Sequence, residues 1–156
     1  MSFSSNPGSL EGTSALVSDR YLITAVVDTA ATVVAGNVVY VSASGFLPSV
    51  KPTDGVRKDV IGVALTGGTA GVKITVICRG LVRLVAAGAI SVAARITSAA
   101  SGQVASVAAM AAPGSDTYTT AAMQAQLDKA EQWIGRALTA AVNPGDVIYA
   151  LLICIP

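Results

Sequence analysis

The chain has 156 residues, of which 53% are hydrophobic and 12% are charged, with a formal net charge of +1. This length suits a single domain with a buried core, and no apolar run reaches the roughly 18–20 residues that a membrane span needs. The near-neutral charge and scattered Lys and Arg argue against a nucleic-acid partner. So few charges predict a surface partly covered by partner subunits, although a monomer coated in Ser, Thr, Gly and Ala is an alternative.

The residue types argue against catalysis. The chain has no histidine, which removes the commonest general base and metal ligand. The acidic residues are isolated, without the pairing that acid–base or calcium chemistry requires. The glycine-rich stretch 67–71 lies between two apolar runs and lacks a following Lys-Ser/Thr, which predicts a hairpin turn and not a phosphate loop. We therefore expect no enzyme activity, no metal or other cofactor and no small-molecule substrate.

The N-terminal segment Met1–Thr13 is rich in Ser, Gly, Pro and Asn, which predicts an extended arm outside a single β-rich domain over 14–156. The segment lacks the basic and apolar regions of a signal peptide, so we expect synthesis and residence in a cytoplasm. Cys78 and Cys154 both lie in apolar strand-like runs. Buried free thiols are the expected state, and a disulfide between them is the alternative.

Short runs rich in β-branched and aromatic residues, separated by turn residues, predict a mainly β fold. In the first half, the predicted strands are Tyr21–Val27, Thr32–Ala35, Val38–Ser42, Phe46–Val50, Val60–Thr66 and Val72–Cys78, with a polar loop at Lys51–Asp59. The last two strands form a hairpin across the glycine turn. In the second half, Leu81–Val85 follows a turn at Arg79-Gly80, and another strand covers Ile90–Thr97.

The second half repeats the motifs of the first in the same order. Ile61–Thr66 and Ile134–Thr139 are identical at five of six positions. Weaker matches join Val33–Gly36 to Val85–Gly88, Ser42–Gly45 to Ala99–Gly102, and Gly71–Ile74 to Gly145–Ile148. This order predicts an internal duplication, approximately 21–80 and 81–156, that forms a small β-barrel or sandwich. Gly62 and Gly135 predict equivalent bulges or bends.

The halves differ at Ser106–Trp133, a long insert where the first half has only the Lys51–Asp59 loop. Strong helix formers predict a short α-helix near residues 120–132. Met123, Leu127 and Ala130 fall on one face of this helix. That face packs either on the end of the protein's own barrel or at a subunit interface.

Four glycine-punctuated stretches, taken in order, carry a family resemblance: Gly36–Val41 with its Ser44-Gly45 turn, Ile61–Thr66, Gly71–Val76 leading to Arg79-Gly80, and Gly145–Ile148. Over roughly Tyr21 to Ile155 they resemble the capsid decoration, or cement, proteins of tailed bacteriophages. The resemblance implies a β-rich homotrimer on the outside of an icosahedral virion. Such a trimer ties neighbouring major capsid protein subunits together and has no catalytic motif.

Partner-binding residues are expected in the arm and on the helix: Phe3, Asn6, Pro7, Leu10, Met123 and Leu127. The arm composition favours an extended chain that orders against a partner, here the major capsid protein. Another minor virion or tail structural protein is the nearest alternative. A ligand-binding or adhesive β-barrel is more distant, because the few aromatic residues are spread thinly and no export signal is present.

Overall fold

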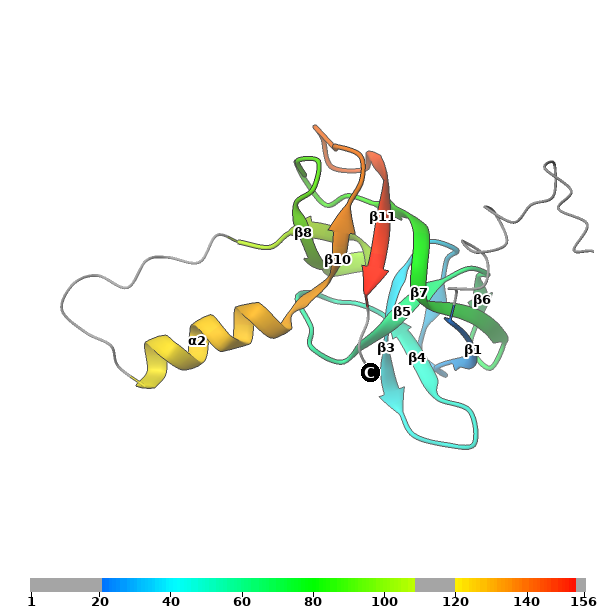
Figure 1. Ribbon diagram of the computed structural model, residues 1–156. Coiled ribbons are helices and arrows are strands. Elements are labelled where there is room, and N and C mark those ends of the chain that lie inside the picture. Colours follow the sequence, from blue (N-terminus) through cyan, green and yellow to red (C-terminus); the bar gives the residue numbers. More distant parts are fainter. Residues whose placement is uncertain (1–20, 109–119, 154–156) are drawn as a thin grey trace, which may run out of the picture.

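The computed structural model describes residues 21–108 and 120–153. Figure 1 shows that these residues form mostly β-strands, with one α-helix at the side. The first part of the chain contains β1 (Tyr21–Val27), β2 (Thr32–Val33), β3 (Val38–Ala43), β4 (Ser49–Pro52), β5 (Val60–Ala64), β6 (Gly68–Thr69) and the beginning of β7 (Lys73–Val85). We call residues 21–79 the first repeat.

The first repeat is a small closed barrel. β1, β4, β3, β5 and β7 pair in this order, and β1 also pairs with β7, which closes the five strands on themselves. β1 runs parallel to β4 and antiparallel to β7, and the other neighbours are antiparallel. The predicted mainly β fold with a small barrel is therefore confirmed.

The rest of the described chain, residues 79–153, forms the second repeat. It contains the end of β7, β8 (Arg95–Ser98), the 3-10 turn η1 (Ala100–Gly102), β9 (Val104–Ser106), α2 (Thr120–Glu131), β10 (Trp133–Ala137) and β11 (Val147–Ile153). β7, β11, β10, β8 and β9 pair in this order. A parallel bridge from Ala86 to Val104 then joins β9 to the end of β7, as β4 joins β1 in the first repeat.

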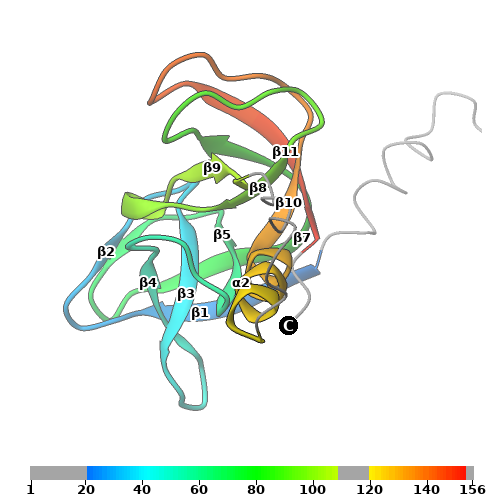
Figure 2. The same ribbon diagram turned by 90° about the vertical axis from the view of Figure 1, so that its left-hand side faces the viewer.

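Hydrogen bonds recur between the repeats as closely as the strand order does. The Leu65 N–H donates to the Thr75 carbonyl and the Leu138 N–H to the Tyr149 carbonyl, each over 2.8 Å. The Thr66 hydroxyl accepts from the Thr75 N–H at 3.0 Å, and the Thr139 hydroxyl accepts from the Tyr149 N–H at 2.9 Å. The two repeats thus share register as well as topology, and Figure 2 shows them stacked one on the other.

β7 belongs to both repeats. Its first part pairs with β1 and its second part with β11, and Arg79 lies opposite both Tyr21 and Ile153. The predicted turn at Arg79-Gly80 is therefore wrong, because the strand continues through both residues from Lys73 to Val85. One continuous strand joins the repeats in place of a linker.

The predicted strand Ile90–Thr97 is also wrong in its first half. Only Arg95–Ser98 is strand, Ile90 makes an isolated bridge to Ala141, and Ala93 has a positive φ of 64° that interrupts an extended chain. Ala93 corresponds to Gly36, which also has a positive φ (92°). The Ala93 N–H donates to the Ala137 carbonyl and the Gly36 N–H to the Ala64 carbonyl. Ala137 and Ala64 are equivalent residues of the repeated Ile-Gly-x-Ala-Leu-Thr motif. The counterpart of Val33–Gly36 is therefore residues 90–93 and not Val85–Gly88.

The strand predicted at Phe46–Val50 begins later, at Ser49, and runs on to Pro52, inside the predicted polar loop. Phe46 lies instead in the loop between β3 and β4 with its side chain fully exposed. The strand begins at Ser49, the first residue that pairs with β3. The predicted start was too early because it was based on the hydrophobicity of Phe46.

Each repeat has its own apolar interior. In the first repeat it includes Val27, Val33, Val39, Val50 and Ile74, and in the second it includes their counterparts Ala86, Ile90, Ile96, Val104 and Ile148. The core of the second repeat also includes four residues of the first repeat that are not part of the first repeat's own core: Val38, Val60, Val63 and Ile77. The outer face of β3, β5 and β7 in the first repeat is therefore buried against the second repeat.

A polar seam also joins the repeats. The side chains of Thr53 and Ser98 are buried, and the hydroxyl of each forms its hydrogen bonds with residues of the other repeat. The Thr53 hydroxyl donates to the Ala99 carbonyl at 2.7 Å, while the Ser98 hydroxyl donates to Gly55 and accepts from the Arg57 N–H. Buried groups of this kind are costly without partners, so these bonds fix how the repeats sit against one another.

α2 projects from the side of the strands (Figure 1). Its observed bounds confirm the helix predicted near 120–132. Over the two described ranges, no helix combines the length and apolar character required to cross a membrane.

Candidate partner-binding surfaces

α2 leaves its apolar side chains in solvent. Met123 and Leu127 are each 55% exposed, so they do not pack on the end of the barrel. Exposed apolar residues on a 12-residue helix are consistent with the alternative interpretation, a subunit interface, because an isolated helix of this length is marginal in water. The other predicted partner-binding residues, Phe3, Asn6, Pro7 and Leu10, lie outside the described residues.

One ion-pair cluster holds α2 near the first repeat. Lys58 Nζ donates to the Asp128 carboxylate and lies 3.4 Å from Glu131 Oε2. The hydrogen bond from Lys58 lowers the pKa of Asp128, and the bond to Asp128 raises the pKa of Lys58. These groups are exposed, so the cluster positions the helix without contributing much to its stability.

Cys78 is a free, buried thiol in β7. Desolvation by burial raises its pKa, which favours the protonated and unreactive form. In the register of the repeats Cys78 corresponds to Leu152, so it fills an apolar position. Cys154 lies outside the described residues. Across those residues, no group of three or more Cys, Asp or Glu is placed to hold a metal ion.

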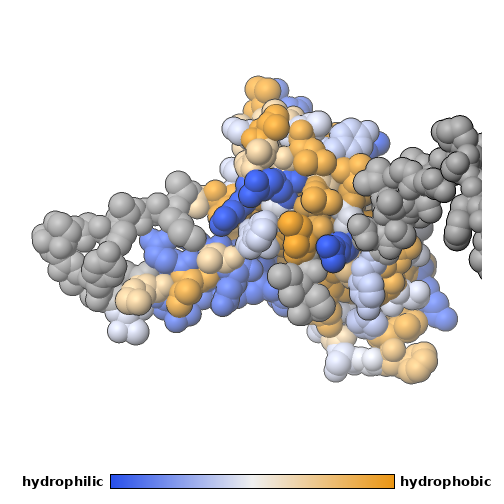
Figure 3. Space-filling model, viewed as in Figure 1, coloured by the Kyte–Doolittle hydropathy of each residue, from blue (hydrophilic) through white to orange (hydrophobic). Residues whose placement is uncertain are grey.

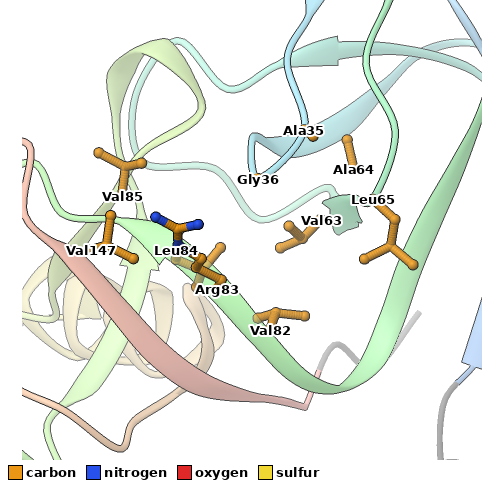
Figure 4. Close-up of a pocket in the computed structure, with 10 residues that line it drawn as sticks. All are labelled: Ala35, Gly36, Val63, Ala64, Leu65, Val82, Arg83, Leu84, Val85 and Val147. Atoms are coloured by element: carbon orange, nitrogen blue, oxygen red, sulfur yellow. The ribbon is translucent and has the colours of Figure 1, made fainter.

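A groove of about 400 Å³ lies between the repeats. Figure 4 shows its lining, which is apolar except for the guanidinium of Arg83. The first repeat contributes Val63 and Leu65, and the second contributes Val85 and Val147. Such a groove can accept an apolar side chain from a partner, with Arg83 at its border.

The outward side of the second repeat carries a row of residues across four strands. Arg95 of β8 lies opposite Arg136 of β10, Arg136 lies opposite Leu151 of β11, and Leu151 lies opposite Leu81 of β7. In the next row Tyr149 lies opposite Arg83. We call these six residues the arginine face, namely Leu81, Arg83, Arg95, Arg136, Tyr149 and Leu151. All six are exposed, and Figure 3 shows apolar and strongly polar side chains side by side over β10 and β11.

The arginines of this face lack acidic partners among the described residues. The ion pairs of that part of the chain involve Lys51, Arg57 and Lys58. Arg95 instead lies over the ring of Trp133, 5.2 Å from its centroid. The arginine face therefore presents unneutralised positive charge among exposed leucine and tyrosine side chains.

The arginine face could not be predicted from the sequence pattern, because its arginines are far apart along the chain. A local signal was present in Arg79, Leu81 and Arg83, whose spacing of two places them on one side of a strand. The assumed turn at Arg79-Gly80 hid that alternation. The contributions of Arg95 and Arg136 depend on strand order, which the sequence pattern does not specify.

The described fold resembles a solved structure, the N base of the head fiber protein gp8.5 of bacteriophage phi29. The match has a TM-score of 0.56, covers 86% of this chain and 94% of that chain, and has 13% sequence identity. This likeness establishes a shared fold. No protein-family profile matches the sequence, and no curated protein matches it.

Proposed function

We propose that this chain is a non-enzymatic structural protein of a bacteriophage virion. In this role it binds the outer surface of an icosahedral head as a homotrimer and bridges neighbouring major capsid protein subunits. The observation that carries the proposal is the fold likeness to the phi29 head fiber base, which extends over nearly all of that base. The exposed Met123 and Leu127, in a chain with few charges, support association with further subunits.

The mechanism needs no chemistry beyond binding. A protein that binds the assembled shell and not free coat subunits stabilises the shell by its binding free energy. Three linked copies raise the effective concentration at each further contact, so weak individual contacts sum to firm attachment.

The likeness to a fiber base supports a second candidate within the same class. In that role the two-repeat fold anchors a longer fiber to the head, and the site of attachment is the same outer surface. The two candidates differ in whether another fiber protein binds the chain after it has bound the shell.

Co-sedimentation with undecorated, expanded shells of the phage that encodes the chain tests the proposal. The wild-type protein should pellet with the shells. It should also raise the temperature at which the shells lose their structure. A deletion of Ser2–Gly12 should fold normally but bind at lower occupancy at limiting concentration, because each trimer loses three linked contacts. Equal occupancy would exclude a binding role for the arm, and no sedimentation of the wild-type protein would exclude the function.

A further inference from the structure

Three residues of the arginine face occupy positions in the second repeat whose counterparts in the first repeat form an internal packing surface. Arg95, Arg136 and Leu151 correspond in register to Val38, Val63 and Ile77. The three first-repeat residues are at most 1% exposed, because the second repeat covers them. This fold therefore uses that side of a repeat for packing, and in the second repeat the same side faces solvent.

From this arrangement we propose that the arginine face docks an acidic and partly apolar surface of another protein. Under the function proposed above, on which this identification rests, that protein is the major capsid protein. Arg95 and Arg136 lie directly opposite each other, and like charges in that position are mutually unfavourable. A carboxylate supplied by a partner between them removes the repulsion and forms charge-assisted hydrogen bonds.

The other residues of the face fit a protein surface. Arg, Tyr and Trp are the residue types that contribute most at protein interfaces, and Trp133 lies beside Arg95. Leu151 and Leu81 continue the row beyond Arg136 and are 43% and 44% exposed. Covering them requires apolar side chains, which a phosphate backbone does not offer, so the face suits a protein better than a nucleic acid.

A second copy of this chain is a poorer fit. Each carboxylate of the described residues already has a partner of its own. Asp28, Asp54, Asp59, Asp128 and Glu131 pair with lysine or arginine, and Asp146 accepts hydrogen bonds from the Val142 and Asn143 N–H groups. The described part of a second copy thus supplies no unpartnered carboxylate for Arg95 and Arg136.

The test compares Arg136→Glu with a matched control, Lys73→Glu. Both side chains are exposed strand positions and both substitutions change the charge by the same amount, but Lys73 lies in the first repeat. Binding of each variant to DNA-free expanded shells is measured by co-sedimentation at several salt concentrations, with Arg136→Gln as a milder variant. Melting temperature and native mass verify folding and assembly.

The expected result is that Arg136→Glu weakens shell binding by about thirtyfold or more, while Lys73→Glu binds like the wild-type protein. Added salt should weaken wild-type binding more than Arg136→Glu binding, because one charge contact is already lost. Arg136→Gln should fall between the two.

Each other outcome overturns the proposal in a distinguishable way. Equal binding by Arg136→Glu and the wild-type protein rejects the arginine face but leaves the shell-binding function intact. Failure of the wild-type protein to bind shells rejects both. A change in native mass on Arg136→Glu identifies the face as a contact between copies. Tight wild-type binding to single-stranded DNA that Arg136→Glu abolishes identifies a nucleic-acid site instead.

Discussion

Gly62 in β5 and Gly135 in β10 lie very close to the backbone of the next strand. A Cβ atom at Gly62 would lie 2.2 Å from the Ile77 carbonyl oxygen, and one at Gly135 would lie 2.3 Å from the Leu151 carbonyl oxygen. Both glycines adjoin a register shift against β3 or β8, which confirms that they occupy equivalent bulged positions. The steric reason for glycine is the same in both repeats.

We expect Gly62→Ala and Gly135→Ala each to lower the free energy of unfolding by about 1 kcal/mol or more, because backbone must shift to admit one methyl group. Urea denaturation measures the change. Gly55→Ala is the control, since a Cβ there meets nothing within 4 Å. Similar small effects at all three glycines would contradict the close approach.

Ala93 adopts the left-handed conformation that its counterpart Gly36 also adopts. In the folded protein, this conformation costs a residue other than glycine roughly 1–2 kcal/mol of strain. Glycine avoids that strain but increases the conformational entropy of the unfolded chain, which lowers stability by about 0.4–1 kcal/mol. We therefore expect Ala93→Gly to raise the melting temperature slightly. Ala99→Gly should lower it, because Ala99 is extended with a φ of −133°. A loss of stability with Ala93→Gly would show that the backbone at Ala93 is not strained enough for glycine to relieve.

At the scale of elements, the sequence pattern predicts those strands that have clean boundaries. β1 matches Tyr21–Val27 completely, and the start of α2 at Thr120 follows from its helix formers. The pattern fails where local and tertiary preferences conflict. Gly80 suggests a turn, yet pairing with β11 on the second half of β7 keeps the chain extended. The exposure of Met123 and Leu127 could not be predicted, because helical periodicity identifies an apolar face but not what covers it.

Lys58 ties the acidic side of α2 to the first repeat through Asp128 and Glu131. We expect Lys58→Gln to increase hydrogen exchange in α2 while leaving the barrel melting temperature almost unchanged, because exposed ion pairs contribute little to global stability. Lys73→Gln is the control. Loss of protection in β7 together with α2 would show that the helix stabilises the barrel.

Acid should release α2 in the same way. The pKa of Asp128 is lowered from its ordinary value of 3.8, so the stabilisation that it provides is complete above that value. It disappears as the pH falls through the lowered pKa and Asp128 becomes protonated. Exchange protection of α2, corrected for the intrinsic pH effect, should therefore decrease below about pH 4 in the wild-type protein and change less in Lys58→Gln. An equal decrease in both proteins would place the acid-sensitive group elsewhere.

At the scale of the whole molecule, the exposed apolar residues predict assembly. Native mass spectrometry should give a mass near three times 15.5 kDa. Leu127→Glu should reduce the mass to that of one chain if α2 lies in the trimer contact, because the charge would be buried without a partner. The control is Ala125→Glu, which adds the same charge at an exposed position about 200° around the helix from Leu127. A wild-type monomer at micromolar concentration would contradict the trimer.

The shared strand β7 brings the two limits of the described fold together. Tyr21, where β1 begins, and Ile153, where β11 ends, both lie opposite Arg79. A peptide or small domain inserted before β1 or after β11 would therefore emerge beside Arg79, on one or the other edge of β7, with the two points about two strand spacings apart. The same proximity suits a circular permutation, in which a short linker joins the two limits and new termini open in the β3–β4 loop beside Phe46. Under the proposed function, the three subunits of a trimer on the shell would display their cargo from three equivalent points.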